Sequence, residues 1–220
     1  PFIEKVKLLK TGTDACEAAV RIARAYQDNN GNSEKDSLGI GLGYHGHSNT
    51  FISAERPGTG TIDGKYQKAK DLDDLIYQLT DFWEMYCYCI IEPVELDLNV
   101  KEQLTTIRRL CSDKGIVLIF DEIITGFRFP DYCVSNHYGI YPDLICLGKG
   151  LGNGHSISVV GGRSDIMETP GYFISGTFFG ELSGIHSALD ILDFLTHDKL
   201  NDLWKRGQEV IDNFNEISPK

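Results

Sequence analysis

Short apolar runs alternate with amphipathic stretches along most of this chain. Runs rich in branched residues predict strands at 6–9, 38–43, 88–91, 115–120 and 157–160. Helical spacing of apolar residues predicts helices over about 14–26, 72–83, 99–114 and 182–196, and a polar amphipathic helix over about 198–215. Residues 53–70, rich in Gly, Thr and Lys, are predicted to form a loop. Strands that alternate with helices are typical of a parallel α/β sheet.

Two of the predicted helices carry further signals. Asp14, followed three residues later by Glu17, has the pattern of a capping box and predicts the start of the first helix. The helix at 182–196 has a single apolar stripe, which we interpret as core and not as a partner surface, at Leu182, Ile185, Leu189, Leu192 and Leu195.

Composition narrows the class of protein. A length of 220 residues fits one compact core, and the net charge of -11 argues against binding nucleic acid or an anionic membrane. No apolar run approaches the roughly 20 residues of a membrane span, and no signal-peptide pattern is present. The six cysteines lack zinc-site spacing, so we expect buried, reduced thiols in a cytoplasmic protein and no metal site.

Three ionisable residues follow predicted strands. Asp121 comes directly after the run 115–120, Glu92 follows 88–91, and Lys149 stands between two glycines after the apolar run 144–147. The carboxyl ends of parallel strands form the edge where open α/β sheets bind ligands. Two acids and a lysine at one such edge suit pyridoxal 5′-phosphate (PLP): the lysine forms a Schiff base and the aspartate partners the pyridinium nitrogen.

Lys149 and Asp121 also have ordinary structural explanations. Lys149 could be a solvated lysine in a glycine-rich turn, and Asp121 a helix cap or loop acid; a nucleophilic lysine is instead expected to be desolvated. Gly12 and Thr13 precede a helix and could cradle a phosphate, or Thr13 could be a plain N-cap.

Charged side chains elsewhere in the chain also admit two readings. His45 and His47 could bind a metal, but we interpret them as orienting their loop. Arg128 and Arg163 are interpreted as structural ion-pair formers, with binding of a substrate carboxylate as the other reading.

Several of these stretches together resemble the class III (fold type I) PLP aminotransferases, and within them the glutamate-1-semialdehyde aminomutase branch. The resemblance is carried by residues 11–26, 43–47, 120–128, 142–149 and 175–181. It implies a three-layer α/β/α fold with a mostly parallel sheet. Residues 1–197 would form the large PLP-binding domain and 198–220 a C-terminal helix, with the small domain of the family missing. Residues 94–97 replace a glycine-containing active-site loop of the family.

The resemblance also implies roles for individual residues. Gly12 and Thr13 would hold the phosphate, Tyr44 and Ile123 would cover the two faces of the cofactor ring, and His45 would lie beside it. Glu92 would support the site, and Lys149 and Asp121 would be catalytic. Thr177 would reach the phosphate of a neighbouring subunit, which implies a homodimer with shared cofactor sites.

The function implied is a PLP-dependent aminotransferase or aminomutase that acts on a small-molecule amine through a Lys149 Schiff base. Without the small domain, we expect low activity. Two alternatives stay open: a non-catalytic PLP-binding protein or degenerate partner subunit, and a fragment that another chain completes.

Overall fold

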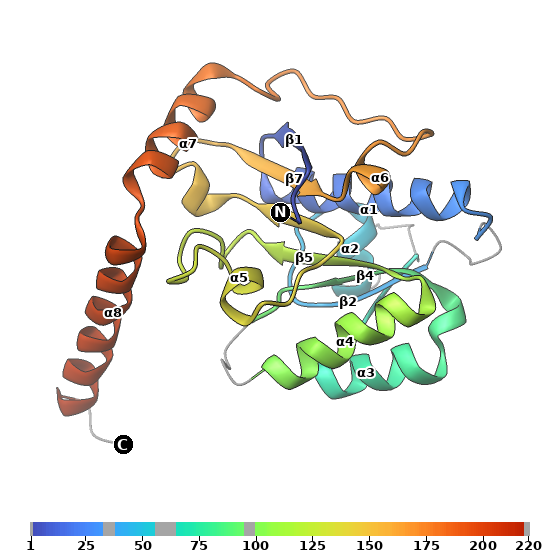
Figure 1. Ribbon diagram of the computed structural model, residues 1–220, viewed down its shortest axis with the longest axis horizontal. Helices are drawn as coiled ribbons and strands as arrows, with labels where there is room; N and C mark the ends of the chain where they lie inside the picture. Colours follow the sequence, from blue (N-terminus) through green and yellow to red (C-terminus); the bar gives the residue numbers. More distant parts are fainter. Residues whose placement is uncertain (1, 33–37, 56–64, 95–99, 218–220) are drawn as a thin grey trace.

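A seven-stranded mixed sheet forms the centre of the molecule in the computed structural model, which describes residues 2–32, 38–55, 65–94 and 100–217 (Figure 1). Its strands lie in the order β1-β7-β6-β5-β4-β2-β3. Neighbours from β6 to β3 pair in parallel, whereas β7 is antiparallel to both β6 and β1. The strands are β1 (Lys5–Leu9), β2 (Leu38–Leu42), β3 (Tyr66–Lys68), β4 (Tyr86–Ile91), β5 (Val117–Glu122), β6 (Leu144–Leu147) and β7 (Ser158–Gly162).

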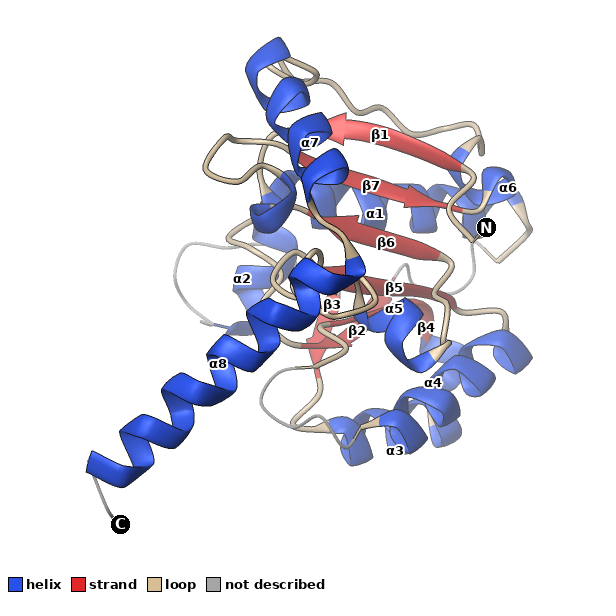
Figure 2. Cartoon of the chain, turned by 60° about the vertical axis from the view of Figure 1, so that its left-hand side comes forward, coloured by secondary structure: helices blue, strands red, loops and turns tan. Residues whose placement is uncertain are grey.

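Helices cover both faces of this sheet (Figure 2). Helix α1 lies on one face, and α3 and α4 lie on the other (Figure 1). The α-helices are α1 (Gly12–Asn29), α2 (Asn49–Glu55), α3 (Leu72–Asp81), α4 (Lys101–Lys114), α5 (Val134–Tyr138), α6 (Ser164–Met167), α7 (Leu182–Phe194) and α8 (His197–Ile217). Two 3-10 turns, η1 (Trp83–Met85) and η2 (Lys149–Leu151), follow α3 and β6. The predicted three-layer α/β/α fold with a mostly parallel sheet is confirmed.

Strand β5 shows how the sequence builds the two cores. Because side chains alternate between the faces of a strand, Val117 and Ile119 pack in the core beneath α1. Leu118 and Phe120 pack in the core beneath α3 and α4. All six residues of β5 are buried. The same alternation places Asp121 and Glu122, which end the strand, on opposite faces of the sheet. The two carboxylates therefore have different surroundings and different roles.

Helix α1 begins earlier than predicted. Its N-cap is Thr11, whose hydroxyl accepts a hydrogen bond from the Asp14 backbone N–H, while the Asp14 carboxylate accepts one from the Thr11 N–H. The capping box is therefore Thr11–Asp14 and not Asp14–Glu17, and Thr13 is not the N-cap. With Thr11 as the N-cap, Gly12 and Thr13 lie in the first turn of α1, where backbone N–H groups have no intrahelical acceptor.

The prediction of a loop over residues 53–70 is wrong for the parts that form α2 and β3. Helix α2 reaches Glu55, and β3 extends the sheet at Tyr66–Lys68. Short elements of this kind take their stability from the sheet they join, so local composition is a poor guide to them. Residues 56–64 lie outside the described part, as do residues 95–97 of the replaced loop and Asn99, where the helix predicted over 99–114 was expected to start.

Helices α7 and α8 expose much of their apolar surface. The stripe on α7 was predicted to be core, but Leu182, Leu189 and Leu192 are 70%, 53% and 51% exposed, whereas Ala188 and Ile191 are buried. Helix α8 starts at the body of the protein, where Leu200 is buried, and extends away from it (Figures 1 and 2). None of the described helices combines the length and apolar composition that crossing a membrane requires.

Candidate active site

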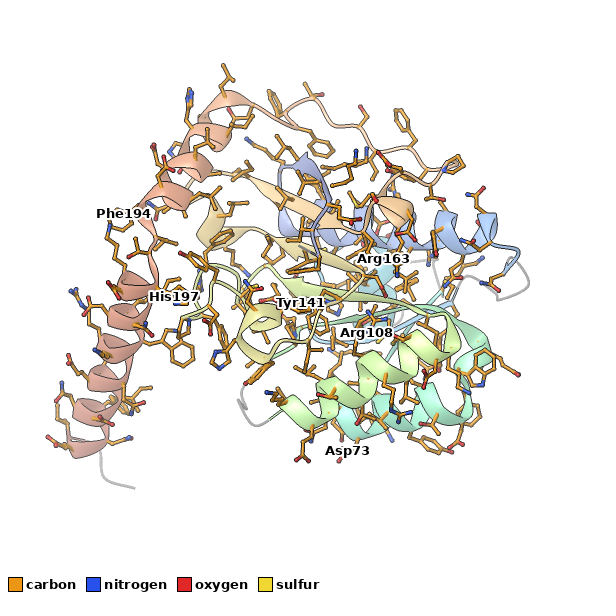
Figure 3. The ribbon with its side chains drawn as sticks, viewed as in Figure 1. Asp73, Arg108, Tyr141, Arg163, Phe194 and His197 are labelled. Atoms are coloured by element: carbon orange, nitrogen blue, oxygen red, sulfur yellow. The ribbon has the colours of Figure 1, made fainter. Side chains whose placement is uncertain are left out.

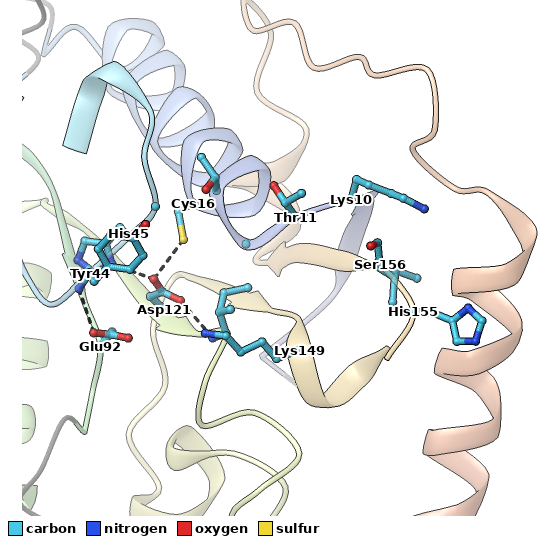
Figure 4. A pocket seen from close by; sticks show the side chains of 15 residues that line it. Lys10, Thr11, Cys16, Tyr44, His45, Glu92, Asp121, Lys149, His155 and Ser156 are labelled. Carbon is cyan, nitrogen blue, oxygen red and sulfur yellow. Dashed lines mark hydrogen bonds and ion pairs between the residues drawn. The ribbon is translucent and has the colours of Figure 1, made fainter. Parts of the chain in front are cut away.

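A cavity of about 360 Å³ opens at the carboxyl ends of the parallel strands, beside the first turn of α1 (Figure 4). Eight of the nine predicted site residues line it: Gly12, Thr13, Tyr44, His45, Glu92, Asp121, Ile123 and Lys149. The three strand-end residues chosen from the sequence thus meet in one cavity. Thr177 does not line it, and its side chain lies on the surface between α6 and α7.

Asp121 is the buried acid of this cavity. It continues the α1-facing side of β5 and is only 3% exposed. One carboxylate oxygen, Oδ1, accepts the Ile123 backbone N–H at 3.1 Å. The other, Oδ2, lies 2.8 Å from His45 Nδ1 and accepts the Cys16 thiol at 3.2 Å. A carboxylate buried this deeply is stable as an anion only when donors surround it, and these three contacts fix its orientation toward the cavity (Figure 4).

Cys16 is a cavity residue that the sequence analysis did not identify. It lies one helical turn beyond Gly12 and Thr13 on α1, so the spacing of three and four residues could have revealed it. A hydrogen bond with Cys146 and complete burial raise the pKa of the Cys16 thiol well above its usual value. The thiol is therefore a neutral donor to Asp121 and not a thiolate nucleophile.

The first turn of α1 leaves two donors for an anion. Thr11 and Asp14 satisfy each other, but within the described residues no acceptor meets the backbone N–H of Gly12 or Thr13. A Cβ at Gly12 would lie 3.0 Å from Ile123 Cγ2, so a larger residue there would press on the wall of the cavity. These N–H groups and the positive end of the helix form an anion-binding arrangement.

Lys149 follows β6 and opens the 3-10 turn η2. Its φ of 38° lies in the left-handed region, which costs a non-glycine residue about 1–2 kcal/mol. Non-glycine residues held in this region cluster at active sites, and Phe127, Tyr132 and Asn153 share a positive φ in this chain. The side chain is exposed, so the desolvated amine expected from the sequence is not found.

Glu92 and Tyr44 form the opposite wall. Glu92 Oε2 accepts the Tyr44 backbone N–H at 2.9 Å. Gly43, with a φ of 118°, lets the chain turn there, and a Cβ at this position would come within 2.7 Å of the same Oε2 atom. Glu92 therefore holds the loop that carries Tyr44, whose side chain is 58% exposed at the cavity.

The two histidines of the Tyr44 loop separate. His45 bonds to Asp121, whereas His47 Nδ1 lies 3.3 Å from the Thr13 hydroxyl. The two imidazoles therefore do not share a metal ion with each other, and each joins the loop to a different side of the cavity. This agrees with the interpretation that they orient the loop.

Glu122 was not predicted as a functional residue, yet it anchors the segment that follows Asp121. It is fully buried on the other face of the sheet and accepts four hydrogen bonds: from Val134 N at 2.7 Å, Ser135 N at 2.9 Å, Ser135 Oγ at 2.6 Å and Thr125 Oγ1 at 2.9 Å. Burial raises the pKa of the Glu122 carboxyl despite these donors. The carboxylate ties the end of β5 to the start of α5, and so fixes the segment that begins at Ile123.

The cavity is also lined by Lys10, Thr11, His155, Ser156 and Ile157. Lys10 Nζ forms a 2.8 Å ion pair with Glu181, which also caps α7. The Lys10 ammonium and the Ser183 hydroxyl lower the pKa of Glu181 to about 2. Strand β1 and helix α7 are thereby joined at the cavity entrance.

Arg163 lies away from the cavity, where it pairs with Asp143 and Asp165 at 3.1 and 2.7 Å (Figure 3). Its predicted structural role is confirmed. Arg128 makes no ion pair within the described ranges, and its carbonyl oxygen accepts the Trp204 indole N–H. The ion pair expected for Arg128 is therefore not found there.

The sequence of this chain is similar to that of a known protein family. A family model described as "Aminotransferase class-III" matches residues 86–219. The glutamate-1-semialdehyde 2,1-aminomutase 2 of Geobacillus kaustophilus is 28% identical over 242 residues, which cover 100% of this chain and 55% of that protein. The chain therefore spans about half the length of the curated relatives it matches.

Solved structures show the same fold. An ornithine aminotransferase from Toxoplasma gondii, with partial occupancy of PLP at its active site, has a TM-score of 0.84 and 28% identity and covers 97% of this chain and 55% of its own. An omega-transaminase from Sphaerobacter thermophilus has a TM-score of 0.85 at 22% identity, with 99% and 56% covered.

Proposed function

Because this chain belongs to the class-III aminotransferase family, we propose that its cavity binds PLP and that the protein transfers amino groups of small molecules. One observation carries the proposal. The amine of Lys149 and the buried carboxylate of Asp121 line the same cavity, next to the free N–H groups of α1. The similarity to an ornithine aminotransferase that holds PLP supports this cofactor.

The anionic end of the cofactor fits the first turn of α1. The N–H groups of Gly12 and Thr13, which have no acceptor among the described residues, would hold the phosphate, and the half-buried Thr13 hydroxyl adds a third donor. The net charge of -11 does not oppose this, because the helix end supplies local positive potential. A phosphate held here would lie over Ile123, which a Cβ at Gly12 would touch.

The ring nitrogen of the cofactor would meet Asp121. When bound, PLP supplies a protonated aromatic ring that stabilises negative charge on the reacting carbon of the substrate. Asp121 would hold that proton on the ring, since its charge is kept in place by Ile123, His45 and Cys16. We further propose that Tyr44 and Ile123 cover the two faces of the ring and exclude water from it.

Lys149 would be the point of covalent attachment. Once the substrate amine has displaced Lys149 from that link, its free Nζ would act as the general base and acid, taking a proton from the substrate carbon and returning it. The side chain is exposed within the cavity and its backbone is fixed by η2, so the amine can move while its origin stays in place. Glu92 would act indirectly, by holding the Tyr44 loop.

A PLP-binding protein without turnover is the rival function. It would need the phosphate cradle and Asp121 but no amine at the reacting position. The presence of Lys149 in the cavity favours the enzyme. The proposal covers both transfer of an amino group between two molecules and its transfer within one molecule, because the relatives include an aminotransferase and an aminomutase.

We also propose a homodimer in which Thr177 contacts the cofactor phosphate of the partner subunit. The segment around it is exposed, with Phe173 and Phe178 at 79% and 66%, and Thr177 lies outside its own cavity. Exposed aromatic side chains of this kind are typical of interface cores. The free, buried cysteines are compatible with the cytoplasmic location predicted from the sequence.

The test of function is a single-turnover assay. Protein loaded with PLP is mixed with a panel of amino acids and amino sugars, and the carbonyl product is measured by mass spectrometry. We expect about one equivalent of product per chain from at least one amine, and none from the Lys149→Ala variant. A PLP-loaded wild type that yields no product from any amine would support the non-catalytic rival.

A further inference from the structure

The floor of the cavity brings together a thiol, an imidazole and a carboxylate. Cys16 comes from α1, His45 from the loop after β2 and Asp121 from the end of β5. Their ligand atoms all lie within 4.8 Å of one another, and all three residues are buried. In the part of the chain that the structure describes, no other three His, Cys, Asp or Glu side chains meet in this way.

These three atoms match the preferences of one metal ion. Zn²⁺ binds sulfur, nitrogen and oxygen in tetrahedral sites, with bonds of about 2.0–2.3 Å that place neighbouring ligand atoms about 3.3–3.5 Å apart. Here Cys16 Sγ is 3.2 Å and His45 Nδ1 is 2.8 Å from Asp121 Oδ2. The ligand atoms are now held together by protons. For each of these two pairs, replacing the shared proton with a metal ion would require the atoms to move apart by only a few tenths of an ångström, and the ligand atoms of Cys16 and His45 lie within 4.8 Å of each other.

The charges of such a site also balance. A thiolate, a carboxylate and a neutral imidazole around a dication have no net charge, which suits a buried position. His45 Nε2 has no hydrogen-bond partner among the described residues, so it can take the imidazole proton when the metal ion replaces the hydrogen bond between Nδ1 and Asp121. The dication deprotonates the thiol that coordinates it, and this proton goes to solvent. Binding therefore releases one proton per ion.

We propose that the cofactor-free protein binds one Zn²⁺ ion through Cys16, His45 and Asp121, and that the ion and PLP exclude each other. The metal site follows from the cluster itself, whereas the exclusion rests on the function proposed above. Both occupants need the negative charge of Asp121: the ion as a ligand, and PLP as the partner of its protonated ring nitrogen. Metal binding would thus regulate how much of the protein carries its cofactor.

Access and coordination number are consistent with this assignment. All three residues line the cavity, so an ion can reach them from solvent. Three protein ligands leave a fourth tetrahedral position for water, as in zinc sites that are open to solvent.

The chain contains a matched control for the thiol. Cys89 and Cys111 are buried and hydrogen-bonded to each other, as Cys16 and Cys146 are. Their pair lies in the other core, where the Arg108 cation acts on it, and among the described residues no imidazole or carboxylate joins it. Cys111→Ala therefore removes a buried thiol of similar surroundings that has no place in the proposed site.

The experiment uses the full chain stripped of PLP and titrated with Zn²⁺, with Co²⁺ as a spectroscopic substitute. We expect one ion and one released proton per chain, and a thiolate-to-cobalt absorption band. Removing a ligand should cost more than the 10–100-fold loss typical of residues that only support ligands. Cys16→Ala is therefore expected to weaken zinc affinity by about 100-fold or more and to abolish the band, while Cys111→Ala changes neither. Cys16→Ser, which keeps a hydroxyl donor for Asp121, provides a second variant if the alanine protein folds poorly.

Competition is measured by adding PLP to the zinc-bound protein and counting both occupants by mass spectrometry under native conditions. We expect each chain to carry one or the other. Failure to bind zinc at micromolar concentration, or unchanged affinity in both Cys16 variants, overturns the metal site. Chains that carry both occupants overturn the exclusion. A chain that binds zinc but never PLP would leave the metal site standing and contradict the proposed function.

Discussion

Replacing Glu122 with alanine tests how the candidate site is held in place. The carboxylate accepts two backbone N–H groups, those of Val134 and Ser135, and two hydroxyls. The hydroxyls can rotate toward other acceptors, but the N–H groups are fixed in a buried position. Each unsatisfied buried donor costs about 1–3 kcal/mol. Relief of the cost of burying the charge offsets part of this loss, so we expect Glu122→Ala to lower the free energy of unfolding by about 2–4 kcal/mol.

The pH dependence of this loss has a definite sign. Burial raises the pKa of Glu122 in the folded state above its ordinary value of 4.5. A carboxyl with a raised pKa contributes stability that is complete below the unfolded pKa and is lost as the pH rises through the folded pKa. The difference in unfolding free energy between wild type and Glu122→Ala should therefore be largest below pH 4.5 and should narrow as the pH rises above it.

Urea denaturation at several pH values measures both effects, with an unchanged slope showing that the compactness of the unfolded state is the same. Glu209, exposed on α8, provides the control, since Glu209→Ala should change stability by less than about 0.5 kcal/mol. A loss below about 1 kcal/mol for Glu122→Ala would refute the anchoring role, because leaving two buried N–H groups without an acceptor should cost more free energy than that. A difference that widens with rising pH would refute the assigned direction of the pKa.

Three further predictions concern the cavity and its rim. Asp121→Asn should weaken PLP retention by about 10–100-fold, the equivalent of one charge-assisted hydrogen bond of about 1.5–3 kcal/mol, and equilibrium dialysis measures it; unchanged retention would remove Asp121 from the site. Thr177→Ala should weaken PLP retention to a similar extent only if the protein is a dimer, so a monomer by light scattering that stays saturated with PLP contradicts the shared site. The pKa of Glu181 is lowered to about 2, so its contribution to stability is present above its ordinary pKa of 4.5 and is lost as the pH falls toward 2. In thermal unfolding, Glu181→Gln should therefore make stability less dependent on pH between 4.5 and 2, and an unchanged pH dependence would contradict the Lys10 pairing.

Strand ends were the most predictable part of this molecule. Uninterrupted branched runs specify buried strands, and the polar residue that ends each run must lie at the sheet edge. Asp121, Glu92 and Lys149 could therefore be brought together from the sequence, and the cavity contains all three. Their chemical roles are a separate matter, since a position at the edge does not by itself give a residue a reaction.

Side chains that reach the cavity from a helix were harder to find. Cys16 is an apolar-looking residue inside an amphipathic helix, and only its spacing from Gly12 marks it. The register of the capping box was missed by three residues because Thr11, Asp14 and Glu17 all have capping chemistry. Which of them caps the helix depends on where β1 ends, and that is set by pairing with β7.

Long-range packing explains the remaining differences. Glu122 and Asp121 are adjacent and chemically alike, yet the alternation of β5 sends one toward α5 and the other into the cavity. The apolar stripe of α7 has the periodicity of a core helix, and periodicity alone does not show what covers it. In the structure, only part of that stripe meets the body of the protein.

The most direct test of the central claim is borohydride reduction of the PLP-loaded protein, followed by peptide mapping. Reduction converts a covalent link between PLP and an amine into a stable pyridoxyl group. We predict one pyridoxyl group per chain, on the peptide that contains Lys149, and none on the same peptide in Lys149→Ala. A protein that remains colourless and unlabelled with added PLP, or one labelled only at other lysines, would contradict the assignment of this cavity.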